Sequence, residues 1–494
     1  MATPSPIIST VIPRRRLPAA AAAAAASSFF ISNAATQRPP PAYQDATSIS
    51  TSAPLLPSPP TSAYIHLPFC RRRCYYCDFP IVALGSSSST SSSFSAQQAP
   101  VPSHNYDPRM SNYIQLLCRE IGMTKPNSPT NPPLQTVFFG GGTPSLVPPM
   151  LVFSILETLR SKFGLHPNAE ISMEMDPGTF DLKKMRELKE LGVNRVSLGV
   201  QAFQEELLKG CGRSHGLREV YEAIDIVGSC GIDNWSMDLI SSLPHQTPEM
   251  WEESLELAVK AGPNHVSVYD LQVEQETKFG QWYTPGEFPL PSESKSAMFY
   301  RMASGMFSDA EYNHYEISSY CKNGYECRHN LTYWQNNSFY GFGLGSASYF
   351  GGVRFSRPRK MKEYTDYVQN LEDGLVNDHP DSKNDSSLDV KDMAMDTVML
   401  SLRMARGLDV REFGSAYGKH LTLSMCKAFE PYIRSSHVIA LDENRKPLDV
   451  HDFNLLMIDG SKFEQTVAFI RLSDPDGFLL SNELISIAFA AISP

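Results

Sequence analysis

Three cysteines within eight residues carry the strongest chemical signal in this sequence. Cys70, Cys74 and Cys77 have the spacing C-x3-C-x2-C and follow directly after a short β-rich run. Thiolates spaced in this way along a loop can converge on one inorganic centre. Structural zinc usually takes four protein ligands, and the sequence has no matching second pair of cysteines. An iron–sulfur cubane needs three cysteines if its fourth iron is left open for another ligand. A zinc-bound interaction module is the alternative interpretation.

Three arginines, Arg71, Arg72 and Arg73, separate the first two cysteines. Their guanidinium groups would offset the negative charge of a thiolate-bound cluster, and a solvated basic loop explains them equally well. The chain has nine cysteines, an odd number scattered along its length, which argues against a disulfide framework. The cysteines therefore favour a reducing compartment.

Further polar or flexible positions follow β-rich runs along the chain. One run ends in Gly140-Gly141-Gly142-Thr143-Pro144, and glycines without Cβ atoms let a backbone approach a ligand closely. Glu174 lies inside an otherwise apolar run, where a charge is costly unless it is paired. Its partner would be a cofactor, a neighbouring arginine or a backbone amide. Gln201, Arg213 and Asp238 lie at or near the next two runs.

The elements that must position these residues alternate between strands and helices. We predict strands at Tyr64–Leu67, Thr136–Phe139, Glu170–Met175, Arg195–Val200, Trp235–Ile240 and His265–Tyr269. Between most of them we predict amphipathic helices at Pro149–Phe163, Asp181–Leu191, Leu217–Val227 and Pro248–Ala261. Such alternation is typical of a parallel sheet. We expect an α/β fold with a partial (β/α)6 barrel, or an open doubly wound sheet as the alternative, and ligands at the carboxyl ends of the strands.

Composition divides the chain into four parts. Residues 1–62 are rich in Ala, Ser and Pro, with four arginines and one acid, which is typical of a transit peptide. We expect a chloroplast address, with the mitochondrion as the alternative and a secretory signal as the competing interpretation. Residues 63–372 form the predicted core, which contains a Ser-rich loop at 85–105, and residues 373–390 form a polar linker. Residues 391–494 form a predicted C-terminal domain with helices at Met393–Met404 and Val410–Tyr417.

The overall composition excludes some functions. The 494 residues are 42% hydrophobic and 19% charged, as in folded soluble proteins. A formal net charge of -10 argues against a protein that coats nucleic acid. No uninterrupted apolar run reaches the roughly 18 residues expected of a membrane span. Peripheral contact with a membrane stays compatible with the sequence.

The cysteine loop and the preceding Tyr64-Ile65-His66-Leu67-Pro68-Phe69 resemble the radical S-adenosylmethionine (SAM) superfamily. More narrowly, the chain is similar to the branch that contains the oxygen-independent coproporphyrinogen III oxidases and the HemW-like heme chaperones. The resemblance covers most of residues 63–494, including a mostly helical C-terminal portion similar to the winged-helix-like domain of this branch. It implies a [4Fe-4S] cluster held by Cys70, Cys74 and Cys77, with SAM on the fourth iron.

The resemblance also implies a set of SAM-binding residues. In the family the glycine loop contacts the amino acid portion of SAM, and an acid in the place of Asp238 would take the ribose hydroxyls. The positions that match are Tyr64, Tyr76, Gly141, Gly142, Thr143, Glu174, Gln201, Arg213 and Asp238.

A second motif, His329-Asn330-Leu331-Thr332-Tyr333-Trp334, looks like the His-Asn-x-x-Tyr-Trp motif that is associated with heme in HemW-like proteins. His329 would supply an axial imidazole, and Tyr333 and Trp334 would supply flat apolar faces. Gly341, Gly343 and Gly345 would leave room for a macrocycle, and Arg354 or Arg328 would meet its propionates. The alternative is a packed aromatic corner with a satisfied histidine. Cys327 is a less favoured thiolate ligand.

One departure separates the two groups of this branch. The oxidases have a fourth cysteine two residues after the third, and this chain has Phe79 there. We therefore expect a heme chaperone that delivers heme to acceptor hemoproteins, with an electron donor such as a ferredoxin or flavodoxin. The alternative is an enzyme that uses a SAM-derived radical to decarboxylate coproporphyrinogen III to protoporphyrinogen IX.

Overall fold

The computed structural model describes residues 59–85, 106–125, 131–350, 352–376, 390–458, 463 and 465–493. Most of the predicted transit peptide, of the Ser-rich loop and of the linker lies outside the described residues; residues 59–62 of the predicted transit peptide are described, and Ser62 begins the first strand.

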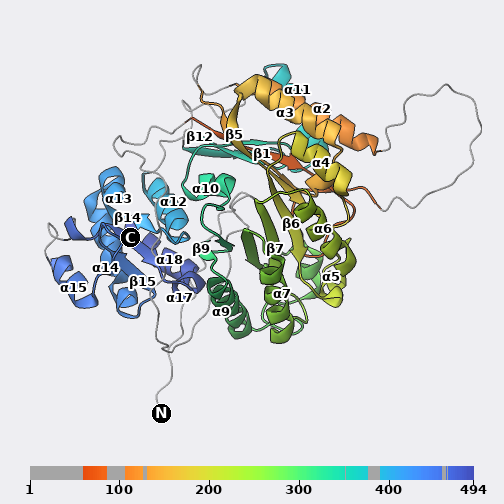
Figure 1. The fold of residues 1–494 in the computed structure, drawn as a ribbon. Coiled ribbons are helices and arrows are strands. Elements are labelled where there is room, and N and C mark those ends of the chain that lie inside the picture. The colour runs from red at the N-terminus through yellow and green to blue at the C-terminus, as the bar shows by residue number, and fades with distance from the viewer. Residues whose placement is uncertain are drawn as a thin grey trace, which may run out of the picture.

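A nine-stranded sheet forms the centre of the molecule (Figure 1). Its strands run in the order β11-β1-β4-β5-β6-β7-β8-β10-β9. Neighbours from β11 to β8 are parallel, and β10 and β9 continue the sheet antiparallel. The strands are β1 (Ser62–Leu67), β4 (Leu134–Gly141), β5 (Leu165–Met175), β6 (Arg195–Gln201), β7 (Trp235–Ser241), β8 (His265–Asp270), β9 (Asn313–Glu316), β10 (Ser319–Cys321) and β11 (Tyr340–Phe342).

All six predicted strands are confirmed, and they are β1 and β4 to β8 in sequence order. The sheet has two different edge strands, β11 and β9, so it forms an open, partial barrel. The pairing of β11 with β1 brings the segment that follows the aromatic motif next to the strand that precedes the cysteine loop. Two regions far apart in the sequence thereby share one edge of the sheet.

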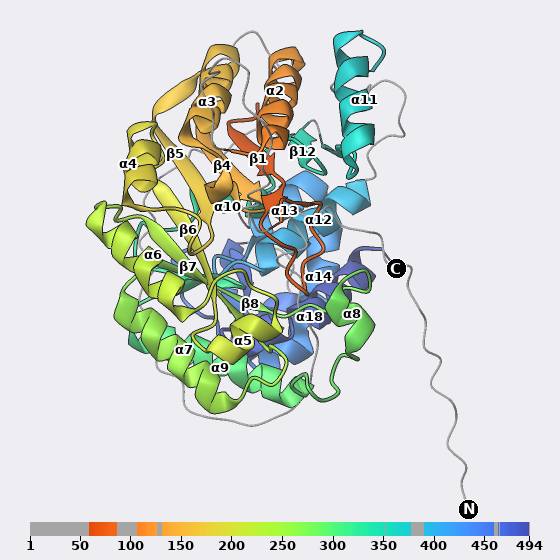
Figure 2. The same cartoon turned by 90° about the vertical axis from the view of Figure 1, so that its right-hand side faces the viewer.

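Helices cover one face of this sheet, as Figure 2 shows from their side. The four predicted helices are confirmed as α3 (Pro149–Phe163), α4 (Leu182–Glu190), α6 (Leu217–Ser229) and α7 (Pro248–Ala261). In α7 the Thr247 side chain accepts from Met250 N–H, Pro248 occupies the first turn, and Gly262 ends the helix in the left-handed region at φ 69°. The remaining helices of the core are α2 (Pro108–Met123), α5 (Glu205–Gly210), α8 (Lys278–Trp282), α9 (Glu293–Asp309), α10 (Arg328–Trp334) and α11 (Met361–Glu372), with a 3-10 turn at Pro144–Leu146.

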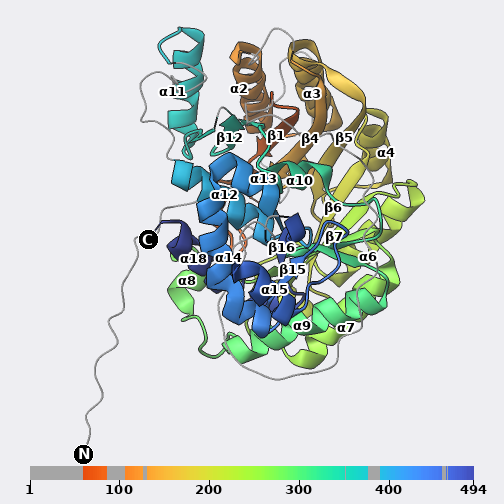
Figure 3. The ribbon, with the colours of Figure 1, turned by 90° about the vertical axis from the view of Figure 1, so that its left-hand side faces the viewer.

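The C-terminal region packs against the opposite side of the sheet, and Figure 3 views it from the front. It has its own hydrophobic core, in which α12, α14 and α18 surround a small antiparallel sheet of order β14-β16-β15. Ile317, Tyr300 and Trp334 of the N-terminal core contribute to this second cluster. Its elements are α12 (Val390–Leu402), β14 (Leu408–Asp409), α13 (Val410–Tyr417), α14 (Lys419–Arg434), β15 (Val438–Leu441), α15 (Val450–Ile458), β16 (Phe469–Leu472), α17 (Asp476–Leu479) and α18 (Ser481–Ile492).

In the part of the chain that the structure describes, no helix combines the length and the apolar character that crossing a bilayer requires.

Candidate functional site

The cysteine loop is anchored to the core by backbone and aromatic contacts. Cys70 ends the short strand β2 (Phe69–Cys70), which pairs in parallel with β3 (Val82–Ala83). The Tyr75 N–H donates to the Cys211 carbonyl at 2.9 Å, and the Tyr75 carbonyl accepts from a backbone N–H of α8 at 3.0 Å. Tyr75 and Tyr76 pack on a small apolar cluster built from α5, α8 and the end of β7. These contacts hold the three thiols at the carboxyl end of the sheet.

Burial keeps two of the thiols protonated unless a cation binds them. It raises the pKa of Cys70 to about 12 and that of Cys77 to about 11, and the other cysteines of the loop contribute to both rises. Hydrogen bonds from polar side chains reach two of the thiols. Thr143 Oγ1 donates to Cys70 Sγ at 3.5 Å, and Arg213 Nη1 donates to Cys74 Sγ at 3.4 Å. Because metal binding stabilises thiolates, this buried donor set fits an iron-containing centre better than three free thiols.

The three thiols do not meet at one point. Within the described ranges, no group of three or more His, Cys, Asp or Glu side chains is spaced to hold a single metal ion. A cubane places each cysteine on a different iron, so its ligands need no common point.

Two of the three arginines in the loop bind backbone carbonyls. Arg71 Nη2 donates to Gly178 O at 2.6 Å, and Arg73 Nη1 donates to the carbonyls of Cys77 and Phe79 at 3.0 and 2.9 Å. Both guanidinium groups are exposed, and the charge of Arg73 also lowers the pKa of Cys77. Arg73 is therefore exposed to solvent and also offsets part of the negative charge that a Cys77 thiolate would carry.

The glycine loop after β4 packs directly against the start of the cysteine loop. Gly142 N–H donates to Leu67 O at 2.9 Å, and Thr143 N–H donates to Phe69 O at 2.7 Å. A Cβ atom on Gly142 would lie 2.7 Å from the backbone of Pro68, so a larger residue would push the two segments apart. Gly142 and Thr143 therefore position the cysteines, and their N–H groups are already occupied.

Glu174 accepts a hydrogen bond from Gly141 N–H at 3.1 Å, so a backbone amide is its partner in this structure. Burial raises the pKa of Glu174 to about 8, and the nearby Asp238 adds to the rise. Asp238 lies on β7 and accepts from Ser197 Oγ at 3.0 Å, and burial raises its pKa as well. Two close acids attract a cation, and SAM carries a sulfonium and an ammonium group. The pair therefore fits SAM.

Gln201 ends β6 in a strained conformation. Its φ is 72°, in the left-handed region that non-glycine residues rarely adopt, and the pairing of β6 with β7 shifts register there. Its Oε1 is buried without a hydrogen-bond partner within the described residues. Strain and an orphaned acceptor at the end of a strand are features of a ligand site.

Arg213 connects this region to the cysteine loop. It forms an ion pair with Asp176 and donates to Gly199 O at 3.0 Å and to Tyr76 OH at 3.1 Å. With its bond to Cys74 Sγ, this arginine spans the predicted cluster and the ends of β5 and β6. Asp176 was not among the predicted site residues, although its place directly after β5 is a signal that could have identified it.

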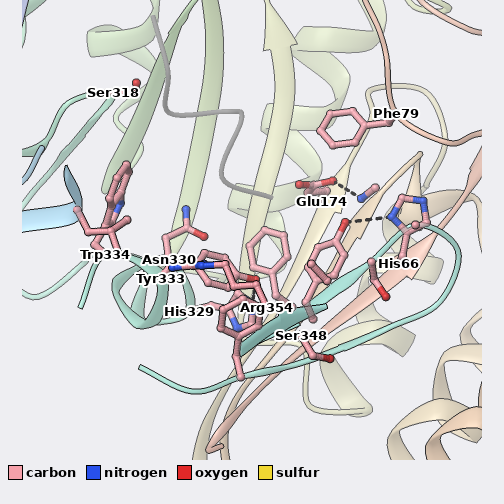
Figure 4. A pocket seen from close by; sticks show the side chains of 18 of the residues that line it. His66, Phe79, Glu174, Ser318, His329, Asn330, Tyr333, Trp334, Ser348 and Arg354 are labelled. Carbon is pink, nitrogen blue, oxygen red and sulfur yellow. Dashed lines mark hydrogen bonds between the residues drawn. The ribbon is translucent and has the colours of Figure 1, made fainter. Parts of the chain in front are cut away.

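A cavity joins two residue sets that the sequence assigned to different ligands (Figure 4). Tyr64, Gly141 and Glu174 of the SAM set line it together with His329, Tyr333 and Trp334 of the heme set. Figure 4 shows Glu174 near His66 on one side, with His329, Tyr333 and Arg354 across the cavity. The other predicted SAM residues and the three cysteines are not part of its lining.

The structure places His329 in the alternative setting that the sequence left open, a packed aromatic corner. Its ring is fully buried, stacks on Phe138 at 5.2 Å and has both nitrogens hydrogen-bonded. Nδ1 lies 2.7 Å from Thr136 Oγ1, and Nε2 lies 2.7 Å from Tyr333 OH. Burial lowers its pKa to about 3, so the imidazole is neutral. As placed, it is a satisfied histidine in an aromatic corner, and either nitrogen would have to lose a partner before it could bind iron.

Of the three glycines that were expected to leave room for a macrocycle, only one lines the cavity. Gly345 lines the cavity. Gly341 belongs to β11, and a Cβ there would lie 1.9 Å from Ala347 O. A Cβ on Gly343, whose φ is 99°, would lie 2.5 Å from Tyr113 OH. These two glycines serve close backbone packing, so they do not make room for a macrocycle.

The two arginines proposed for propionates differ in position. Arg354 lines the cavity, lies 4.5 Å from the Tyr349 ring centre and donates to Asn336 Oδ1 at 3.0 Å. Arg328 donates to Asn168 O at 3.1 Å and is exposed, away from the lining. Cys327 is buried and is not part of the cavity lining.

Sequence reasoning missed several residues of the cavity. His66 lines it and bonds Tyr64 OH at 3.2 Å through Nδ1 and Pro80 O at 3.0 Å through Nε2. Its position as the penultimate residue of β1 was an available signal. Glu316 also lines the cavity, and it lies in the run Tyr315–Ser318 that fits the HemW-like pattern, although no role was predicted for it. Arg403 lines the cavity too, and nothing in its local sequence marks it. Phe79, where the oxidases have cysteine, forms part of the wall.

Comparison with known proteins shows the family of the chain. Residues 64–258 match the Radical SAM superfamily. The chain is 39% identical over 437 residues to the heme chaperone HemW of Synechocystis, covering 88% of this chain and 97% of that protein. It is 31% identical to HemW of Bacillus subtilis, covering 73% and 88% of the two chains. It is 34% identical to HemW of Escherichia coli, covering 62% and 73%.

A solved structure has a similar fold. The coproporphyrinogen III oxidase HemN of Escherichia coli, described as a radical SAM enzyme, matches with a TM-score of 0.64 and covers 87% of this chain and 90% of its own. The sequence identity is 19%, so this likeness concerns the fold.

Proposed function

This chain belongs to the HemW family of radical SAM proteins, and we propose that it is a heme chaperone that binds heme and passes it to acceptor hemoproteins. The observation that carries the proposal is the shared cavity. Its walls combine the acid of the SAM set, Glu174, with the aromatic motif at Tyr333 and Trp334. Apolar side chains on several elements give it the character of a site for a flat, largely apolar ligand.

In this proposal Cys70, Cys74 and Cys77 hold a [4Fe-4S] cluster whose fourth iron binds SAM. When bound, cluster and SAM together supply one-electron chemistry at the sulfonium. The chain's own residues orient these groups. Arg213 would neutralise charge beside Cys74, Glu174 would offer a carboxyl group to the cationic part of SAM, and Asp238 would accept from its ribose hydroxyls. The electron for the cluster would come from a donor of the ferredoxin or flavodoxin type.

The heme would lie against Tyr333, Trp334 and Phe79, which line the cavity. Arg354 offers a cation for a propionate. Phe79 also supports the chaperone over the oxidase, because a phenyl ring cannot replace the sulfur of a cysteine ligand. We leave the axial ligand unassigned, since both nitrogens of His329 are already bonded.

The test incubates protein purified without oxygen with heme and, separately, with SAM, a reductant and coproporphyrinogen III. We expect stoichiometric heme uptake, followed by transfer to an apo-hemoprotein, and no protoporphyrinogen IX. Formation of protoporphyrinogen IX would instead establish the decarboxylase. Failure to take up heme under any of these conditions would refute the chaperone.

The cluster has a matched control within the chain. Cys74→Ala should remove iron, labile sulfide and the absorbance near about 400 nm that iron–sulfur clusters show. Cys118→Ala removes another partly exposed thiol, on α2 and outside the loop, and should leave all three unchanged. Iron content that survives Cys74→Ala would argue for a different centre.

We also propose import into a chloroplast, on the composition of residues 1–62 alone. A fluorescent protein fused after these residues should accumulate in plastids. Accumulation in mitochondria or in the secretory pathway would replace this assignment.

A further inference from the structure

Arg403 is a buried cation in the wall of the cavity. It lies in the turn directly after α12, and its relative exposure is 6%. Its Nη2 donates to Asn482 Oδ1 at 2.9 Å, and its Nε is buried without a partner. Within the described residues no carboxylate lies at ion-pair distance from it. Its hydrogen-bonding capacity is therefore only partly used by the protein.

Two other buried arginines of the described residues each have an acid at ion-pair distance. Arg357 pairs with Glu120 at 2.7 Å, and Arg213 pairs with Asp176. Burying a guanidinium without an acid is costly, and burial lowers the pKa of Arg403 to about 10, so it still carries its charge at neutral pH. An unpaired cation that persists beside a cavity is explained if the ligand brings the missing anion.

The backbone fixes Arg403 relative to the core. Its carbonyl accepts from Ile317 N–H at 2.9 Å, and Met404 forms a bridge with Glu316 on β9. Glu316 also faces the cavity and is engaged by Ser318 N–H at 3.2 Å. Arg403 therefore lines the cavity from the C-terminal side.

The surrounding wall suits a ligand with an apolar body and acidic ends. Trp334 and Met399 line the cavity together with Arg403, and both pack on the C-terminal hydrophobic cluster. Arg354 provides a second cation from β13 (Val353–Ser356), with Asp396 at 3.8 Å as a partly exposed partner. Cations on two different elements, separated by apolar surface, match a macrocycle with more than one carboxylate.

We propose that Arg403 binds a propionate carboxylate of the tetrapyrrole through its guanidinium and thereby makes the cavity selective for tetrapyrroles with free carboxylates. This inference rests on the proposed function and assigns a ligand contact to a residue outside the aromatic motif. Guanidinium and carboxylate groups form strong paired hydrogen bonds, and a buried setting strengthens them.

The experiment titrates the full chain, with its cluster, with three probes in the same detergent: heme, heme dimethyl ester and iron-free protoporphyrin IX. The ester lacks the charged carboxylates, and protoporphyrin IX lacks the iron. We expect the wild-type protein to bind heme about 10- to 100-fold more tightly than the ester, as expected for a charged hydrogen bond. Arg403→Gln should weaken the binding of heme and of protoporphyrin IX by a similar factor and leave the binding of the ester unchanged.

Two further variants keep the result interpretable. Arg406→Gln changes an exposed arginine three residues away and should bind all probes as the wild type does. Arg403→Lys keeps the charge and should retain most of the preference for heme over ester. If Arg403→Gln fails to fold, Arg403→Met takes its place and should lose the preference for heme over ester in the same way.

The outcomes separate the two proposals. Equal binding of heme by Arg403→Gln and wild type, or equal binding of heme and ester by wild type, overturns the role of Arg403 and leaves the chaperone intact. No binding of any probe by the wild-type protein overturns the chaperone itself.

Discussion

The carboxyl group of Glu174 stands between two neighbours with opposite effects, the Gly141 amide that favours its charge and Asp238 that opposes it. Burial raises its pKa from 4.5 to about 8. Between these values the folded protein keeps a proton that the unfolded chain has lost. The free energy of unfolding therefore falls as the pH rises from about 4.5 to about 8.

Glu174→Gln should remove this pH dependence, because the amide oxygen can still accept from Gly141 and carries no charge. Without SAM, the free energy of unfolding of the variant relative to that of the wild type should rise by about 1–2 kcal/mol from about pH 6 to about pH 9. This value is reduced because the carboxyl group is partly open to the cavity. Urea unfolding at the two pH values measures the difference. Glu190→Gln, on the exposed face of α4, should follow the wild type at both.

The hydrogen bonds of His329 decide which substitution best tests its role in heme binding. A loss of heme binding in His329→Ala would be ambiguous, since the ring also bonds Thr136 and Tyr333 in the core. Tyr333→Phe is more informative because it leaves Nε2 buried and unpaired. We expect a loss of about 1–3 kcal/mol in the free energy of unfolding, and a heme absorption spectrum like that of the wild type.

Tyr221→Phe is the control, because this tyrosine is 47% exposed on α6 and its substitution should change neither stability nor spectrum. If Nε2 ligates heme iron after loading, Tyr333→Phe should instead bind heme more tightly with a shifted spectrum. That outcome would return His329 to the role of axial ligand.

Residue types predicted part of the site. Glu174 was identified because a charge in an apolar run needs a partner, and His329 because its motif resembles that of HemW-like proteins; both line the cavity. The partners themselves were not predictable. Gly141 and Thr136 are far from them in sequence, and the missing acid of Arg403 becomes visible only when its surroundings are folded.

At the scale of elements, hydrophobic periodicity located the six parallel strands because each is buried on both faces and bounded by helices. It did not reveal β11, which is three residues long and joins the sheet beside β1 after more than 270 residues of chain. Periodicity predicts that a segment is a strand, but it does not predict which other strand it pairs with. The cavity depends on this pairing, so its composition was out of reach of the sequence.

Two glycine substitutions test the packing of elements, with opposite expected signs. In Gly341→Ala the new methyl group would meet Ala347 O at 1.9 Å and force β11 from the following strand. We expect a loss of about 1–3 kcal/mol in the free energy of unfolding. In Gly305→Ala, within α9, nothing lies within 4 Å of the new Cβ, and stability should rise by about 0.5–1 kcal/mol.

Urea unfolding of both variants and the wild type measures these changes. Destabilisation by Gly305→Ala as large as that of Gly341→Ala would mean that backbone conformation, and not the contact with Ala347, sets the cost.

For the whole molecule, the cavity belongs to both halves of the chain. Tyr64 and Glu174 come from the central sheet, and Met399 and Arg403 come from α12 and the turn that follows it. The composition of residues 391–494 predicted a compact unit with helices near Met393 and Val410, and these helices are present. Which face of that unit would complete a ligand site depends on packing between distant segments, and so was not predictable.

A contact at this junction provides a test of the shared cavity. His314 on β9 lies with Nδ1 2.9 Å from Asp474 Oδ1, stacks on Tyr320 at 4.1 Å and contacts Phe478 of α17 edge-on at 5.0 Å. Removing the imidazole loosens the C-terminal region without touching the cavity or the cysteines. We expect His314→Ala to lower the free energy of unfolding by about 1–3 kcal/mol and to weaken heme binding, while iron and sulfide content stay at the wild-type level.

Arg301→Gln is the control. It breaks the exposed pair with Asp476 across the same junction, and it should lower the free energy of unfolding by less than about 1 kcal/mol and leave heme binding unchanged. If His314→Ala lowers stability and heme still binds as in the wild type, the C-terminal wall contributes little to the ligand, and the heme lies against the central sheet alone.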